Sequence, residues 1–158
     1  AEPQEVNAPA EETPVEETAA EPAYTVSETL TRPVPGEVMT EFSDTPVYSE
    51  TMRDYRVHAG TDYTAAHGET VHACANGIVK ETHTDMLRGN MIVIEHGDYE
   101  VRYCGLGETF LVHEGDVVTA GQDIGSVTAA PFESALDSHL HIEVTRNGEP
   151  VDPESVFG

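Results

Sequence analysis

The sequence predicts an all-β domain built from antiparallel sheets of short strands, and three observations support this class. Apolar and polar residues alternate over runs of about four to eight residues, as they do in half-buried strands. Turn signals rich in Gly, Asn and Asp separate these runs at short intervals. No segment sustains the 3.6-residue apolar period of a helix, apart from single turns expected near 49–55 and 153–157.

The first 27 residues differ in composition from the rest of the chain. They carry seven Glu and four Pro but no Lys or Arg. A segment so charged and so poor in large apolar residues cannot bury enough surface to form a core. We therefore predict an acidic disordered linker at residues 1–27 and one folded domain at residues 28–158.

The expected strands follow one another along the folded part. β-branched residues in alternating runs favour strands, and Gly, Asn and Asp between the runs favour turns. Asn147-Gly148 is a strong hairpin signal. The expected strands lie within 69–83, 90–97, 99–106, 116–121, 123–128 and 139–144.

The charge of the chain restricts its partners. Thirty acidic and seven basic residues give a net charge of −23, and without the seven Glu of the linker the remainder still stands at −16. Such a field repels nucleic acid and anionic membrane surfaces. No apolar run approaches the roughly 20 residues of a membrane span, and no signal peptide is recognisable. The chain begins at Ala1 rather than Met, so we leave open a signal or membrane anchor upstream.

Two cysteines, Cys74 and Cys104, are too few for a disulfide framework. We expect both to be small buried hydrophobic residues on strands, with a single bridge as the alternative. The eight histidines are more informative, because they outnumber the seven Lys and Arg together. This ratio favours metal or acid/base chemistry.

The stretch "SHLHIEV" at 138–144 places two histidines in an apolar run. On a strand, His139 and His141 point to one face together with Glu143, while Leu140, Ile142 and Val144 point to the core. Two solvated histidines on a half-buried strand are the simpler interpretation of these residues alone. A metal site needs further ligands from elsewhere in the chain.

A second pair of candidate ligands lies upstream in "YRVHAGTDY", where His58 and Asp62 flank Gly60. Gly60 would let the backbone fold so that both side chains converge, although a capped turn would explain the same pattern. Zinc is usually four-coordinate, and a catalytic zinc keeps one position open beside three protein ligands. His58, Asp62 and one of His139 and His141 would supply three ligands, and the remaining histidine would act as an acid/base or oxyanion-stabilising group.

"HAGTD" followed downstream by "HLHIEV" resembles the LytM/lysostaphin-type zinc endopeptidases, which cut peptide cross-bridges in bacterial peptidoglycan. Further similar segments are "RPVPGEVMTEFS", "GETVHACANGIV", "GNMIVIEHG", "VHEGDVVTAGQDIG" and "NGEPVDP", so that the resemblance covers residues 32–157. It implies the LytM/lysostaphin-like β fold (the duplicated hybrid motif type) and zinc as the cofactor. It also implies that His58, Asp62 and His141 are the zinc ligands and that His139 is catalytic.

The sequence departs from this family at one position. Active members carry a second catalytic histidine in a strand that reads Tyr-x-His-Leu, whereas this chain reads "YCGL" with Gly105 in the place of the histidine. Cys104 should point to the opposite face of the strand from Tyr103 and Gly105, so we expect that it cannot replace the histidine. We therefore expect weak or absent hydrolysis, and we expect Gly105→His to restore activity by on the order of 10²-fold. The five histidines outside the family motifs are expected on the surface, without function: His67, His72, His83, His96 and His113.

Two functions are compatible with this pattern, and both imply a location outside the cytoplasm, tethered to a membrane or secreted. The first is a zinc-dependent peptidoglycan endopeptidase, with cross-bridge peptides as substrate. The second is a non-catalytic binding domain. The stretch "VYSETMRDYRVHAGTDY" together with "YCGL" is similar to the degenerate LytM domain of the endospore engulfment channel, which implies a partner membrane protein. The zinc triad favours the first function, and Gly105 favours the second.

Overall fold

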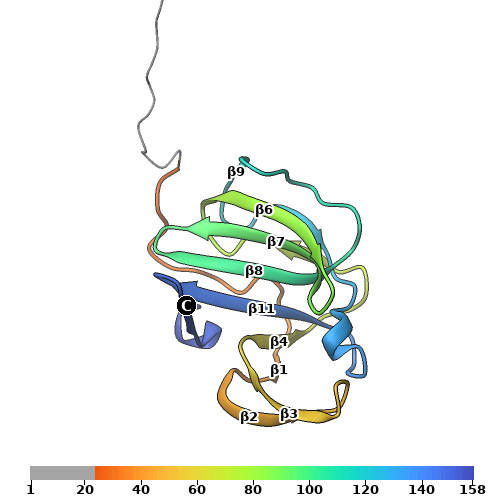
Figure 1. The fold of residues 1–158 in the computed structure, drawn as a ribbon. Helices are drawn as coiled ribbons and strands as arrows, with labels where there is room; N and C mark the ends of the chain where they lie inside the picture. Colours follow the sequence, from red (N-terminus) through yellow and green to blue (C-terminus); the bar gives the residue numbers. More distant parts are fainter. Residues whose placement is uncertain (1–23) are drawn as a thin grey trace, which may run out of the picture.

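The computed structural model describes residues 24–158, which fold around one large antiparallel sheet (Figure 1). This sheet has eight strands in the order β1-β4-β11-β8-β7-β6-β9, with β12 paired to β11. Its strands are β1 (Val38–Thr40), β4 (Thr61–Thr64), β6 (Gly77–Asp85), β7 (Gly89–His96), β8 (Tyr99–Leu106), β9 (Val117–Val118), β11 (His139–Arg146) and β12 (Glu149–Val151). The predicted all-β class is confirmed.

Two smaller sheets complete the strands. One pairs β5 (Thr70–His72) with β10 (Asp123–Ser126), and the other is the hairpin of β2 (Ser43–Ser49) and β3 (Asp54–His58). Figure 1 shows this hairpin at the lower edge, beside β1 and β4. Two short 3₁₀ turns, η2 (Pro131–Glu133) and η3 (Pro153–Ser155), lie before and after β11. Within residues 24–158 no helix has the length and apolar character needed to cross a membrane.

The core lies on one face of the large sheet, and β11 shows how the sequence divides the two faces. Leu140, Ile142 and Val144 are fully buried in the core, as the alternation predicts. The intervening residues, His139, His141 and Glu143, point to the opposite face. Other large buried members of the core are Tyr63, Val71, Ile92, Ile94, Tyr103, Leu106 and Ile124.

Most of the predicted strands and turns are present. Asn147 and Gly148 both have positive φ and connect β11 to β12, which confirms the expected hairpin. A 3₁₀ turn occurs at Pro153–Ser155, within the expected 153–157. At 49–55 the structure has the turn of the β2–β3 hairpin, two strands that the alternation did not identify. The turn η2 was not predicted either, and it proves important for the site.

Two expectations about single residues have opposite outcomes. Cys74 and Cys104 are both free and fully buried, as small hydrophobic residues on or beside strands would be. The expectation that His96 is a surface residue is wrong, because only 2% of its area is exposed. Its ring lies between the carbonyl oxygen of Asn76 and the hydroxyl of Tyr103.

The described structure includes four residues that we assigned to the linker. Tyr24 donates a hydrogen bond to Glu95 and accepts one from the backbone N–H of Gly97, and the Thr25 carbonyl accepts one from the Asn76 side chain. The folded part therefore extends to Tyr24 at least, beyond the predicted boundary at residue 28. The rest of the predicted linker, residues 1–23, lies outside the described residues.

Candidate metal centre

His58 and Asp62 are brought together by a sharp connection between two strands. His58 is the last residue of β3, and Asp62 is the second residue of β4. Gly60 lies between them, where a Cβ atom would be only 2.3 Å from the carbonyl oxygen of Ile142 in β11. The glycine is needed because the backbone passes this close to the neighbouring strand.

The pairing of β11 then places the two downstream histidines beside this connection. His141 lies directly opposite Asp62 on β4 and opposite Cys104 on β8. Cys104 therefore lies on the face of His141, and the expectation that it points away from the site is wrong. His139 lies two residues earlier on the same face and is 5% exposed. The structure thus brings together all four side chains selected from the sequence, His58, Asp62, His139 and His141.

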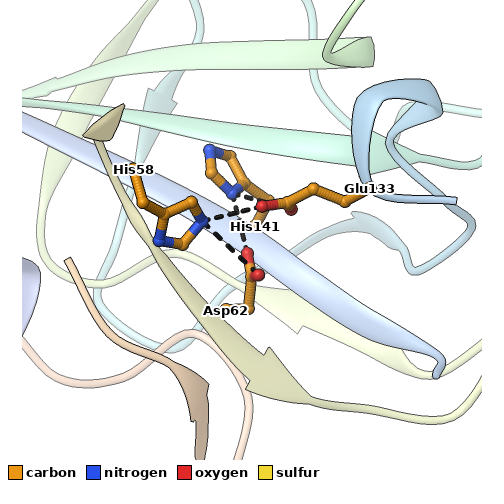
Figure 2. A group of neighbouring side chains, drawn as sticks. All are labelled: His58, Asp62, Glu133 and His141. Atoms are coloured by element: carbon orange, nitrogen blue, oxygen red, sulfur yellow. Dashed lines mark hydrogen bonds and ion pairs between the residues drawn. The ribbon is translucent and has the colours of Figure 1, made fainter. Parts of the chain in front are cut away.

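A fifth side chain, Glu133 from η2, completes the cluster (Figure 2). Its Oε2 lies 2.7 Å from His58 Nε2, and its Oε1 lies 3.0 Å from both His141 Nδ1 and His139 Nε2. The Oδ1 atom of Asp62 lies 2.8 Å from His141 Nδ1. One ligand atom each from His58, Asp62, Glu133 and His141 can be chosen so that all four lie within 4.8 Å of one another.

The hydrogen bonds around the cluster fit a cation. His58 Nδ1–H donates to the Glu41 carbonyl oxygen at 2.8 Å, and His141 Nε2–H donates to the Glu143 carboxylate at 2.9 Å. Such outer contacts take up one ring nitrogen of each histidine, so His58 Nε2 and His141 Nδ1 face the carboxylates of Asp62 and Glu133 and, once they lose their protons, can offer lone pairs to a metal. Asp62 Oδ2 is one of three buried side-chain polar atoms in residues 24–158 without a hydrogen bond. Two neutral imidazoles and two carboxylates are a donor set that suits zinc.

The electrostatics of the cluster point the same way. Burial disfavours the charged form of His58, but the carboxylates of Asp62 and Glu133 outweigh it and raise its pKa to about 9. Burial likewise opposes the charge of His141, whose pKa is nevertheless raised well above its usual value by Asp62, Glu133 and Glu143. The pKa of Glu133 is lowered by its three histidine partners against the effect of burial. The site therefore stabilises positive charge at its centre.

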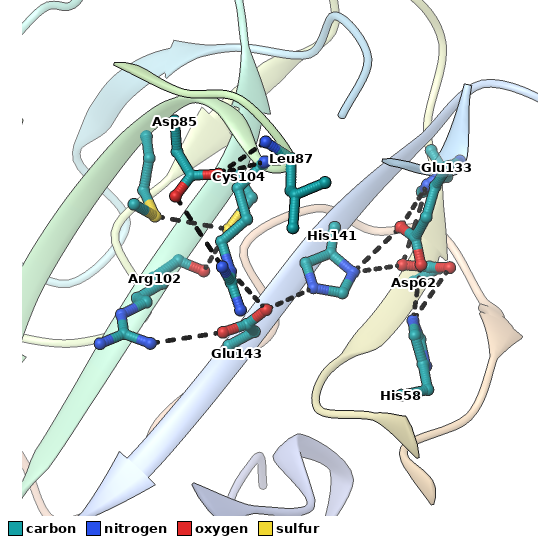
Figure 3. Close-up of polar contacts among 12 residues, drawn as sticks. His58, Asp62, Asp85, Leu87, Arg102, Cys104, Glu133, His141 and Glu143 are labelled. Atoms are coloured by element: carbon teal, nitrogen blue, oxygen red, sulfur yellow. Dashed lines mark hydrogen bonds and ion pairs between the residues drawn. The ribbon is translucent and has the colours of Figure 1, made fainter. Parts of the chain in front are cut away.

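Behind His141, a second layer of charges extends across the sheet (Figure 3). Glu143, 4% exposed, accepts a hydrogen bond from Arg88 Nε at 2.8 Å and lies 3.5 Å from Arg102. The partners of Glu143, first His141 and then Arg88, lower its pKa to about 2 although burial opposes this. The carboxylate thus stays ionised and holds the His141 ring in position.

Gly105, the position of the missing histidine, has a constrained environment. Its φ is 72°, and a Cβ atom would lie 2.7 Å from the backbone nitrogen of Ala130 and 3.0 Å from the carbonyl carbon of Ala129. The histidine side chain that we expected Gly105→His to restore would therefore be both strained and crowded at this position. Backbone from the segment before η2 occupies the space that a side chain at position 105 would need.

Sequence reasoning missed Glu133 as a member of the site. The residue lies in "PFES", a stretch without strand alternation or family motif, and only the three-dimensional path of residues 128–137 brings it to the cluster. Glu143 was placed on the correct face of β11, but its contact with His141 was not predicted. Proline ahead of an acidic residue was the one local signal for a short turn here.

A hollow of about 240 Å³ opens beside the cluster. It lies between the β2–β3 hairpin and η2, and the residues around it include Tyr48, Val57, His58, Phe132, Glu133 and Leu136. Tyr48 and Val57 are 53% and 52% exposed, so the hairpin presents apolar side chains to solvent here, next to the charged Glu50 and Arg56.

The model of Peptidase family M23 matches residues 56–153. Among sequence relatives, the peptidoglycan DD-endopeptidase ShyA of Vibrio cholerae is 35% identical over 96 residues, which are 60% of this chain and 22% of ShyA. The chain thus spans about a fifth of the length of that relative.

Solved structures agree on the fold. A zinc-containing peptidase from Vibrio cholerae superimposes with a TM-score of 0.66 at 27% identity, covering 82% of this chain and 39% of that one. A chain of the SpoIIQ–SpoIIIAH pore-forming complex gives a TM-score of 0.71 at 22% identity, covering 82% of this chain and 91% of that one. The second likeness shows the LytM-type fold alone.

Proposed function

Because this chain belongs to peptidase family M23, we propose that it is a zinc-binding domain of the peptidoglycan endopeptidase type that acts outside the cytoplasm with weak or absent hydrolysis. One observation carries the proposal. The side chains of His58, Asp62 and His141 converge, with His58 Nε2 and His141 Nδ1 directed at carboxylates, while Gly105 contributes no side chain to the site. This convergence supports a metal site of the family's type that lacks the second histidine.

The proposed ligands are His58 through Nε2, Asp62 through its carboxylate and His141 through Nδ1. A zinc that these three residues hold with one coordination position free would supply Lewis-acid polarisation of a peptide carbonyl. Glu41 and Glu143 orient the two histidine ligands from outside the cluster. His139 lies beside the ligands with Nδ1–H donating to the Asp137 carbonyl oxygen, so its Nε2 faces the site and can exchange a proton there.

The loss at Gly105 argues for weak turnover. One positioned acid/base group typically contributes roughly 10²–10⁴-fold in rate. Four of the other histidines in the described structure, His67, His72, His83 and His113, are partly or largely exposed, and His96 is buried against Tyr103. None of these is among the side chains that converge with His58 and His141, which supports the lack of a second acid/base group.

The second candidate function is a non-catalytic scaffold that pairs with a partner membrane protein, as in a sporulation engulfment channel. Gly105 supports it, as does the fold likeness to the SpoIIQ–SpoIIIAH complex over most of both chains. The first function implies that the domain binds cross-bridge peptides of peptidoglycan. The second implies that it binds an extracytoplasmic domain of another protein. The net charge of −23 argues against nucleic acid under either.

Zinc analysis and wall digestion together test the proposal. Protein purified without added metal should carry about one zinc per chain, whereas His58→Ala should carry none. Zinc content below about a tenth of an equivalent after soaking would contradict the metal site. Purified cross-linked peptidoglycan should be cleaved negligibly by the parent protein. Rapid digestion that His58→Ala abolishes would contradict weak hydrolysis and establish an efficient enzyme.

A further inference from the structure

Glu133 occupies the side of the cluster that the three proposed ligands leave open. It is 5% exposed, and its two oxygens reach His58 Nε2 at 2.7 Å and His141 Nδ1 at 3.0 Å (Figure 2). We propose that Glu133 is the fourth protein ligand of the metal and closes the site. This rests on the zinc binding proposed above and specifies what kind of site it is.

The segment that carries Glu133 is fixed at several points along its length. Thr128 N–H donates to the Gly105 carbonyl oxygen at 2.7 Å, and Phe132 N–H donates to the Leu87 carbonyl oxygen at 3.0 Å. Beyond η2, Ala135 N–H donates to the Thr51 hydroxyl at 2.9 Å. These bonds connect the segment to β8, to the β6–β7 turn and to the β2–β3 hairpin, so Glu133 is held in place by three separate parts of the fold.

The ring of Phe132 adds packing at the cluster. Its centroid lies 5.0 Å from that of His141 in an edge-to-face arrangement. Phe132 and Glu133 thus contact the same ligand from adjacent positions of η2. This packing of Phe132 on His141 indicates that Glu133 belongs to the folded site and does not reach it from a solvent-exposed loop.

Gly105 explains why the segment can follow this path. The backbone of Ala129 and Ala130 lies where a side chain at position 105 would begin, with Ala130 N only 2.7 Å from the Cβ position. Glu133 follows three residues later. The absence of the histidine and the arrival of the carboxylate are therefore two consequences of one arrangement, because a side chain at position 105 and this path of the segment exclude each other.

The number of protein ligands decides what a zinc site can do. Catalytic zinc keeps a position for an exchangeable ligand beside three protein ligands, whereas structural zinc has four protein ligands. With Glu133 in place the donor set is His58, Asp62, Glu133 and His141. The metal would then stabilise the junction of β3, β4, β11 and η2 and would offer no position to a peptide.

Cobalt substitution tests this closure without relying on activity. The visible spectrum of the Co²⁺ protein should not change on titration with thiocyanate, because no coordination position is free. The Co²⁺ form of Glu133→Ala should change, because the anion can take the vacated position. Glu108→Gln, which removes an exposed carboxylate elsewhere, is the matched control and should behave as the parent.

Zinc affinity, measured by competition with a chromophoric chelator, gives the second readout. Glu133→Ala should bind zinc at least about tenfold more weakly than the parent and Glu108→Gln. A thiocyanate response in the parent protein itself, or equal zinc affinity in Glu133→Ala, would overturn the fourth ligand while leaving zinc binding intact. A parent protein that binds neither metal would instead overturn the zinc site and this inference together. The parent titration decides the question even if Glu133→Ala folds poorly.

Discussion

His141 and His96 are almost equally buried, at 1% and 2% exposure, but their surroundings differ in kind. Three carboxylates, those of Asp62, Glu133 and Glu143, contact the His141 ring. His96 instead donates from Nδ1 to the Asn76 carbonyl oxygen and accepts at Nε2 from the Tyr103 hydroxyl. The Tyr103 oxygen accepts a hydrogen bond from Cys74 N–H, and its hydroxyl hydrogen is donated to His96.

The two surroundings stabilise opposite charge states. The carboxylates hold the pKa of His141 well above its usual value, although burial alone would lower it. His96 has no comparable partner, and burial lowers its pKa to about 4. Burial by itself therefore does not identify a functional histidine. The chemistry of the neighbouring atoms separates a cation-binding site from a neutral structural contact.

Metal dependence should separate the two histidines most strongly. Free zinc at roughly a thousand times its Kd should raise the free energy of unfolding of the parent by about 4 kcal/mol, because the ion binds the native state. His141→Gln should remove this increment, whereas His96→Gln should retain it. Urea unfolding with zinc and with chelator measures both. A His96→Gln protein that lost the zinc response would show that the two environments are not independent.

The second prediction concerns pH, which should affect stability through His96. The folded-state pKa of His96 is about 4 and its ordinary value is 6.5, so the unfolded chain takes up a proton first as the pH falls. Stability is therefore complete above pH 6.5 and is lost between pH 6.5 and 4, by about 3 kcal/mol. Urea unfolding of the metal-free protein across this range should show a steeper loss in the parent than in His96→Gln.

The exposed His113, with 88% of its side chain accessible, provides the matched control for that measurement. His113→Gln should reproduce the pH dependence of the parent. If His96→Gln also reproduces it, His96 is not the buried neutral group that its contacts with Asn76 and Tyr103 indicate. The other titrating groups are common to all three proteins and cancel in the comparison.

On the His141 side, backbone crowding at Gly105 should have a smaller effect. Gly105 and Gly121 have φ of 72° and 84°, but a Cβ atom at Gly121 would meet open space. Gly121→Ala should thus lose only the conformational cost of about 1 kcal/mol, and Gly105→Ala at least about 2 kcal/mol, because it also crowds Ala130. Urea unfolding measures the difference. Equal losses would contradict the crowding, and Gly105→His would then again be expected to restore hydrolysis.

Strand alternation and motif spacing predicted much of this molecule. The faces of β11 follow from the period of two, which put Leu140 and Ile142 in the core and His139 and His141 together outside it. The hairpin at Asn147-Gly148 follows from turn chemistry. These features are local, so a single strand or turn contains the information.

The features that escaped prediction depend on contacts between distant segments. Glu133 reaches His58 across 75 residues of sequence, and the Tyr103 hydroxyl that orients His96 is itself fixed by Cys74. Gly105 was identified as a missing histidine, but the backbone that fills its space comes from Ala129 and Ala130. No local pattern records which loop crosses a given strand. The path of residues 128–137 therefore had to come from the structure.

The smallest expected effect concerns the segment that covers the His96 side. Tyr24 bonds Glu95 and Gly97, and Ser27 Oγ accepts from Asn76 N–H, the residue whose carbonyl oxygen holds His96. A chain that begins at Glu28 should therefore be less stable than one that begins at Tyr24 by about 1 kcal/mol, since these hydrogen bonds are partly exposed. Urea unfolding of the two truncated chains measures this, and equal stability would show that residues 24–27 contribute nothing.

Zinc affinity should be the same in both chains, because none of these contacts involves His58, Asp62 or His141. A loss of zinc affinity on removal of residues 24–27 would show that the two histidine environments are coupled across the sheet.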